Sequence, residues 1–377
     1  MKQVPGFINL FLVVSFFLIL NACNGKSKSD QPHEGKRVEE KKKNYKPKQK
    51  EVPAQPPLPV VHPKLQDLRL FVIRMHEIKP KWSTGFISLS DIYHPDTAAM
   101  PDLTEKEFED IQYLKLTGKN RKAFLAGTKI SETDTVFLYD YAIDVLATFP
   151  VKSLGVMATP SVYRSKEDWP FPQDDFMIGF EIKPNHLKKF GEYSDHTLVF
   201  IGKENHFIKG QLKPIKWEKI AVKDFPSTST DAATYSKVNT TLREFTFPKS
   251  FSILKNKEVQ VNTYKYETNG YRYFIKSFFI KREGYDEILA RRLLIYKSDP
   301  QELVCDNSFV LSDGLSPTPL NYVERKDDQA AYQWTGNLFR NKPPVIFEFE
   351  YASFGCPGIT FLSKSEGEIY INCDNRH

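Results

Sequence analysis

Short segments of aromatic and β-branched residues recur from residue 68 to residue 373, and they constrain the fold of this chain more than any other feature. Each segment is bounded by Gly, Pro, Asp or Asn, which commonly end β-strands. The pattern therefore predicts a mostly β protein. The expected strands are 68–73, 135–139, 176–182, 197–201, 271–280, 293–296, 345–351 and 368–373.

A clear start signal for a helix occurs once, at Thr104. Thr104 and Glu107 match a capping box, in which two side chains satisfy backbone N–H groups of the first turn. Apolar residues then follow at helical spacing, at Phe108, Ile111 and Leu114. We therefore expect one short helix near 104–115, and residues 286–292 are compatible with a second.

The body of the chain, residues 65–377, exceeds the length at which one hydrophobic core usually keeps growing. Three strand–turn–strand segments within it look alike, at 137–146, 199–208 and 294–304. A repeat of this unit would build a six- to seven-bladed β-propeller, the first of two architectures that we expect.

Two β-sandwich or barrel-like domains are the second expected architecture, because any antiparallel β protein contains many hairpins. The best boundary is 225–233, a small and polar stretch without apolar periodicity. It would separate a β-rich N-terminal part, 65–224, from a β-rich C-terminal part, 234–377.

Residues 1–22 have the features of a secretory signal peptide. Lys2 supplies the charged region, an apolar run extends from Phe7 to Leu20, and the small residue Ala22 occupies the expected cleavage position. The apolar run is shorter than a transmembrane helix requires. We therefore expect the chain to be exported and residues 1–22 to be removed.

The sequence Leu20-Asn21-Ala22-Cys23 resembles the lipobox of bacterial lipoproteins. This resemblance covers only residues 1–23. It implies that fatty-acyl chains such as palmitate modify the Cys23 thiol and anchor the protein to a membrane. Asn24, in place of the Asp that retains such proteins at the inner membrane, implies the outer membrane, on its periplasmic or its surface face. The alternative is an unmodified cysteine after an ordinary signal peptide.

Residues 23–64 form a predicted linker, rich in Lys and Pro and almost without large apolar residues. Such a composition cannot bury a core, so we expect disorder and a span on the order of 35 Å. The linker carries essentially the whole net charge of +6, which leaves the body close to neutral. A nucleic-acid partner is therefore not expected. The linker is expected either to be a solvated spacer or to be attracted to anionic lipid or polymer through its lysines.

Three cysteines follow Cys23, at positions 305, 356 and 373. An exported chain meets an oxidising compartment, so one disulfide and one free thiol are expected. A predicted hairpin around residues 364–367 brings Cys373 opposite Cys356. We therefore expect a Cys356–Cys373 disulfide, with a pairing through Cys305 or three reduced thiols as the alternatives.

The sequence contains no short catalytic or cofactor motif and no metal-ligand spacing, so we expect neither a cofactor nor a metal site. Pro170 and Pro172 should keep their loop out of a central strand. The candidate ligand-binding residues lie in and after this loop: Trp169, Phe171, Asp174 and Asp175. The alternative is that Trp169 closes the end of a domain. Trp82 and Trp334 lie in similarly loop-like sequences.

The anchor, the linker and the missing catalytic motifs favour a non-enzymatic, lipid-anchored envelope protein whose β-rich body binds a macromolecular partner. Exposed aromatic rings are typical of surfaces that bind glycans or proteins. The alternative is an envelope hydrolase that cleaves glycans through a pair of carboxylates, which spacing in the sequence does not identify.

The lipid anchor can be tested by replacing the modified residue. We expect Cys23→Ser to abolish acylation and to release the protein from the membrane fraction, because the acyl chains supply the buried methylenes that hold it there. Metabolic labelling with a fatty acid, followed by fractionation, measures both effects. A variant that is still cut normally and still resists a carbonate wash would contradict the anchor.

Overall fold

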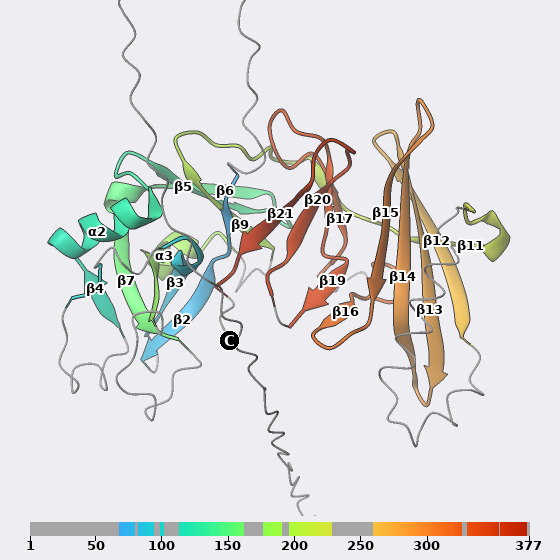
Figure 1. The fold of residues 1–377 in the computed structure, drawn as a ribbon, viewed down its shortest axis with the longest axis horizontal. Coiled ribbons are helices and arrows are strands. Elements are labelled where there is room, and N and C mark those ends of the chain that lie inside the picture. The colour runs from blue at the N-terminus through green and yellow to red at the C-terminus, as the bar shows by residue number, and fades with distance from the viewer. Residues whose placement is uncertain are drawn as a thin grey trace, which may run out of the picture. The chain divides into compact units, whose positions relative to one another are not determined.

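The computed structural model describes residues 68–79, 82–93, 99–101, 113–161, 176–190, 196–227, 259–325, 330–353 and 355–374. These residues belong to one compact unit, Val61–His377. The described part is mostly β, as the sequence predicts, and its strands form four sheets (Figure 1). None of its helices combines the length and the apolar content needed to cross a membrane.

The largest sheet has nine strands and curls into a half-barrel, with the order β10-β17-β18-β20-β21-β1-β9-β5-β6. These strands are β1 (Leu70–Phe71), β5 (Thr135–Asp140), β6 (Val145–Pro150), β9 (Thr197–Gly202), β10 (Leu212–Pro214), β17 (Trp334–Gly336), β18 (Val345–Phe347), β20 (Gly358–Phe361) and β21 (Glu368–Asn372). The two-residue strand β1 pairs in parallel with β21 and antiparallel with β9. It therefore joins a strand from the middle of the chain to a strand near its C-terminal end.

Strand β5 illustrates how the nine-stranded sheet is buried on both faces. Its sequence has four consecutive large apolar residues, and successive side chains of a strand point to opposite faces. Val136 and Leu138 belong to one hydrophobic core, whereas Phe137 and Tyr139 belong to another. A continuous apolar run is typical of a strand that is covered on both sides.

A five-stranded antiparallel sheet covers one of these faces, with the order β2-β3-β8-β7-β4. Its strands are β2 (Arg74–Lys79), β3 (Trp82–Ser88), β4 (Leu114–Leu116), β7 (Gly155–Pro160) and β8 (Phe176–Ile182), and the helices α2 (Gly118–Thr128) and α3 (Pro184–Leu187) accompany it. Ile87, Phe124 and Phe180 share a core with Leu138 of the nine-stranded sheet. The rings of Phe124 and Phe180 meet edge to face at 5.7 Å.

The other five-stranded sheet is a meander of long antiparallel strands, in the order β11-β12-β13-β14-β15. Its strands are β11 (Glu218–Ile220), β12 (Gln260–Thr268), β13 (Tyr271–Arg282), β14 (Tyr285–Lys297) and β15 (Glu302–Val310). Asn269 and Gly270, both with positive φ, form the tight turn between β12 and β13. One face buries Ile275 and Leu293 against Ile346 of the nine-stranded sheet. Figure 1 shows β12 to β15 of this meander in gold and orange beside the red C-terminal strands.

Short elements complete the described fold. Strand β16 (Leu315–Pro317) pairs antiparallel with β19 (Glu350–Ala352), and the pair forms the fourth sheet. Three 3₁₀ turns lie at Ser90–Ile92, Val151–Ser153 and Val222–Asp224.

The β-propeller expectation is wrong, because the described strands form no radial series of equal blades. The three similar segments belong to different surroundings: 137–146 is the β5–β6 hairpin, 199–208 runs out of β9, and 294–304 links β14 to β15. Strands from both sides of the expected boundary at 225–233 share the nine-stranded sheet, and residues 228–233 lie outside the described residues.

The helix expectations also need correction. Residues 102–112 lie outside the described residues, but Leu114, expected in a helix near 104–115, lies in β4. Residues 286–292 belong to the long strand β14 and not to a second helix. The helix α2 was not predicted; it begins at a glycine, and its N-cap residue Thr117 makes no side-chain cap.

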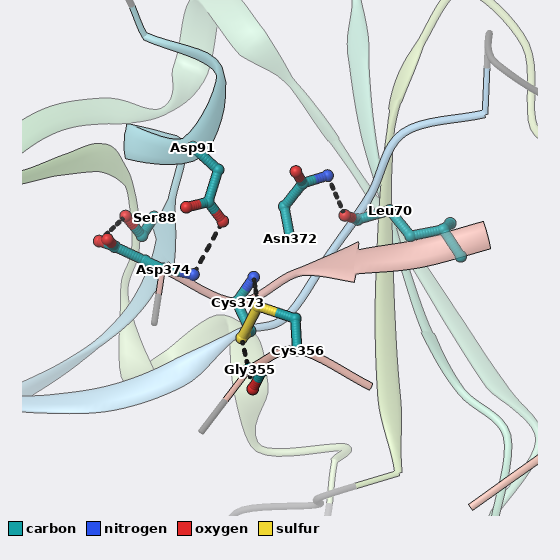
Figure 2. Close-up of a disulfide and its surroundings, with 8 residues drawn as sticks. All are labelled: Leu70, Ser88, Asp91, Gly355, Cys356, Asn372, Cys373 and Asp374. Carbon is teal, nitrogen blue, oxygen red and sulfur yellow. Dashed lines mark hydrogen bonds between the residues drawn. A yellow bond between two sulfur atoms is a disulfide. The ribbon is translucent and has the colours of Figure 1, made fainter. Parts of the chain in front are cut away.

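The expected disulfide is confirmed: Cys356 and Cys373 are bonded, with their Cα atoms 5.5 Å apart (Figure 2). Cys305 is a buried free thiol, and burial raises its pKa to about 12. The C-terminal segment is held further by hydrogen bonds to the N-terminal part of the fold. The Asn372 side-chain amide donates to the Leu70 carbonyl oxygen at 2.8 Å, and the Asp374 backbone N–H donates to Asp91 Oδ2 at 2.9 Å.

The stabilising effect of the disulfide can be measured by removing it. Replacing Cys356 and Cys373 together by Ala should lower the free energy of unfolding by about 3 kcal/mol, because the bridge closes a loop with a sequence separation of 17. Urea denaturation with and without reductant checks this. Reductant should lower the stability of the parent protein to that of the variant and leave the variant unchanged. Equal stabilities under oxidising conditions would contradict the prediction.

Candidate binding cleft

A cleft of about 790 Å³ lies against the meander of long strands, and we call it the Arg291 cleft. One side is formed by β12, β13 and β14, and the other by the last residue of β16 and the segment that follows it. Its lining consists of Asn262, Tyr264, Ser277, Phe279, Lys281, Arg282, Gly284, Tyr285, Asp286, Ile288, Arg291, Pro317, Pro319, Val323 and Glu324.

The floor of the Arg291 cleft is a polar row that crosses three strands. Asn262 of β12 stands opposite Ser277 of β13, and Ser277 stands opposite Arg291 of β14. Directly opposed residues of antiparallel strands have Cβ atoms about 5 Å apart. The register therefore brings an amide, a hydroxyl and a guanidinium together on one face of the sheet.

A β-bulge in β14 decides which arginine faces the cleft. The pairing shifts between Phe278 and Phe279, so that Leu289 is an extra residue in β14. Beside Tyr285 at the start of the strand, the lining residues of β14 are consequently 286, 288 and 291, so that their spacing changes from two to three across the bulge. A bulge of this kind re-aims the side chains that follow it.

Arg291 is nearly completely buried, with 1% of its side chain exposed. Its Nη2 atom donates to Glu324 Oε2 at 2.5 Å. Within the described residues, neither Nε nor Nη1 has a hydrogen-bond partner, and Ser277 Oγ beside them has none either. Burial lowers the pKa of Arg291, and the Glu324 carboxylate opposes this shift. Buried donors without acceptors cost free energy, so these groups leave a polar requirement that the described residues do not meet.

The wall that carries Glu324 is held by a network of hydrogen bonds. The Leu320 backbone N–H donates to Glu324 Oε2 at 2.8 Å, and the Glu324 N–H donates back to the Leu320 carbonyl oxygen at 3.0 Å. Asn321 donates to the Gln333 carbonyl oxygen, and Gln333 donates to Thr318 Oγ1. These contacts fix the position of the carboxylate that faces Arg291.

The rim of the cleft is charged and aromatic. Arg282 Nε forms an ion pair with Glu287 Oε2 at 2.5 Å, and Lys281 stands opposite Asp286 in the strand register. Tyr285 lines the cleft, yet 63% of this residue is exposed. Large exposed aromatic side chains with few rotatable bonds are effective binding groups because little entropy is lost when they are fixed.

The structure tests few of the residues that the sequence singled out as a site. Cys23, Trp169, Phe171, Asp174 and Asp175 lie outside the described residues. Trp334 is not a loop residue, because it lies in β17, is buried, and donates through Nε1 to the Ala331 carbonyl oxygen. Trp82 is the first residue of β3.

Sequence reasoning missed Arg291, although a signal for it existed. Arg291 and Arg292 interrupt the apolar run from Leu289 to Ile295. Two consecutive charges inside a buried strand face opposite sides, so each needs its own partner. Arg292 finds one in Asp306, which it contacts through Nε at 2.9 Å and Nη2 at 3.0 Å. Two nitrogens of Arg291, Nε and Nη1, have no hydrogen-bond partner among the residues that the structure describes.

No protein family, curated protein or solved structure matches this chain. Within the described residues, no three His, Cys, Asp or Glu side chains lie together in a group that could hold a metal ion. The Arg291 cleft is therefore interpreted from its own geometry.

The ion pair on the cleft wall can be tested by truncation. Glu324→Ala should destabilise the protein by about 3 kcal/mol, because it leaves a buried guanidinium without its charge partner. The matched control Glu287→Ala, which opens the more exposed pair with Arg282, should change stability by less than about 1 kcal/mol. Denaturant unfolding measures both. Equal effects would show that Arg291 does not depend on Glu324.

Proposed function

We propose that this chain is a lipid-anchored protein of the cell envelope whose β-rich body binds a glycan in the Arg291 cleft. The observation that carries this proposal is the polar floor, where Ser277 and Arg291 have donors without partners among the described residues. A site built to bind sugar hydroxyls needs a few well-placed polar groups in a concave surface.

The shape and lining of the cleft favour a glycan over a protein partner. A protein interface is usually broad and buries about 800 Å² on each side. The Arg291 cleft instead combines a recessed polar floor with one exposed ring, Tyr285, at its rim. Sugar rings can stack on an aromatic side chain while their hydroxyl groups make hydrogen bonds below.

The anchor and the linker complete this proposal. Acylation at Cys23 would hold the protein on a membrane, for which the sequence favours the outer membrane. The linker 23–64 would then let the body reach on the order of 35 Å from the lipid surface. An envelope glycan within that reach is the partner that this arrangement suits. No cofactor is part of the proposal.

A pair of matched tyrosine variants tests the glycan site. Glycan-array screening identifies a bound sugar, and calorimetry measures its affinity. Tyr285→Ala should weaken binding about tenfold, the scale of an exposed aromatic anchor, with little change in melting temperature. Tyr351→Ala is the control, since Tyr351 is also 63% exposed but does not line the cleft. It should bind as the parent protein does.

Three results would contradict the proposal. Equal losses in the two tyrosine variants would place the site elsewhere. Failure of every glycan, together with specific recovery of a protein partner, would favour a protein ligand. Release of new reducing ends from a bound glycan would favour the alternative of an envelope hydrolase.

A further inference from the structure

The unused groups on the floor of the Arg291 cleft indicate what kind of atom the ligand presents there. An arginine side chain has five N–H donors and no acceptor. Within the described residues only Nη2 of Arg291 is engaged, by Glu324, so the donors of Nε and Nη1 face no acceptor. On the adjacent strand, the Ser277 hydroxyl also has no hydrogen-bond partner among these residues.

Acceptor-rich groups suit this floor better than hydroxyl groups do. A sugar hydroxyl brings a donor as well as acceptors, and a donor finds no use against a guanidinium. A carboxylate brings two oxygens that only accept. Hydrogen bonds between a guanidinium and a carboxylate are also about twice as strong as those between neutral groups.

The other cations that line the cleft lie at its rim. At the rim, Arg282 is paired with Glu287, and Lys281 stands opposite Asp286. Arg291 is the buried cation of the cleft, and its Nε and Nη1 donors have no partner among the described residues. Because the Arg291 side chain is buried, an anion bound to it would be shielded from solvent as well. Salt should then weaken binding much less than it weakens contacts between exposed charges.

We propose that the Arg291 cleft binds a carboxylate-bearing sugar, a uronic acid unit of an acidic glycan, with the carboxylate on Arg291 and Ser277. This inference rests on the proposed glycan function and narrows it to one class of ligand. Tyr285 at the rim contacts the sugar ring or its neighbour. A sulfate ester shares the acceptor chemistry but is tetrahedral, whereas a carboxylate matches the plane of the guanidinium.

The test uses two probes that differ only at the acidic group. They are an oligogalacturonate and the same oligosaccharide after reduction of its carboxyl groups to alcohols. Calorimetry with the full-length protein in detergent should show at least about tenfold tighter binding of the acid. Raising the salt concentration from 50 to 500 mM should reduce its affinity less than about threefold, unlike that of a surface ion pair.

Variants assign the effect to the floor. Arg291→Met removes the guanidinium but also breaks a buried ion pair, so Ser277→Ala serves as a milder second variant. Ser277→Ala should weaken binding of the oligogalacturonate about tenfold and leave that of the reduced probe nearly unchanged. Tyr351→Ala is the control and should bind both probes like the parent protein. If Ser277→Ala binds the acid as the parent protein does, the carboxylate does not bind at the floor of the cleft.

The outcomes separate this inference from the function on which it rests. Equal affinities for the acid and the reduced probe overturn the carboxylate assignment and leave a glycan site in place. A preference for sulfated or neutral sugars on a glycan array overturns it as well. No binding of either probe, with no glycan bound on the array, overturns the proposed function itself.

Discussion

The pairing of β1 with both β9 and β21 is the constraint on which the nine-stranded sheet depends. The strand has only two residues, Leu70 and Phe71, and both are fully buried. Without them the sheet would separate into β10-β17-β18-β20-β21 and β9-β5-β6. The disulfide and the Asn372 side chain lie next to this junction and hold the C-terminal strand where β1 needs it.

The sequence predicted the strands well because their signals are local. Apolar runs such as that of β5, bounded by turn residues, identify buried strands without knowledge of their neighbours. Sheet order is not local, and the parallel contact of β1 with β21 joins residues 302 positions apart, such as Leu70 and Asn372. Three locally similar segments therefore suggested a structural repeat, but the long-range pairing of the strands is not repetitive. Residues 345–351, expected as one strand, divide into β18 and β19 at Glu348, which has φ of +62°.

The candidate cleft was beyond sequence reasoning for the same physical cause. Its floor exists only because three strands align Asn262, Ser277 and Arg291 in one row, and its wall comes from a segment after β16. The bulge at Leu289 then selects Arg291, and not Arg292, for the cleft side. The arginine pair in an apolar strand was visible in the sequence. Its hydrogen bonding was not, because the acceptors come from distant positions: Glu324 for Arg291 and Asp306 for Arg292.

The position of β1 also has a mechanical consequence. Any pull transmitted along the chain from its N-terminal side enters the described fold at Leu68 and reaches β1 next. Because β1 is hydrogen-bonded on both edges, the load is shared at once between β9 and β21. Under the proposed N-terminal anchor, a pull from a bound partner would therefore act first on the pairing of β1 with β9 and β21, the junction that holds the nine-stranded sheet together.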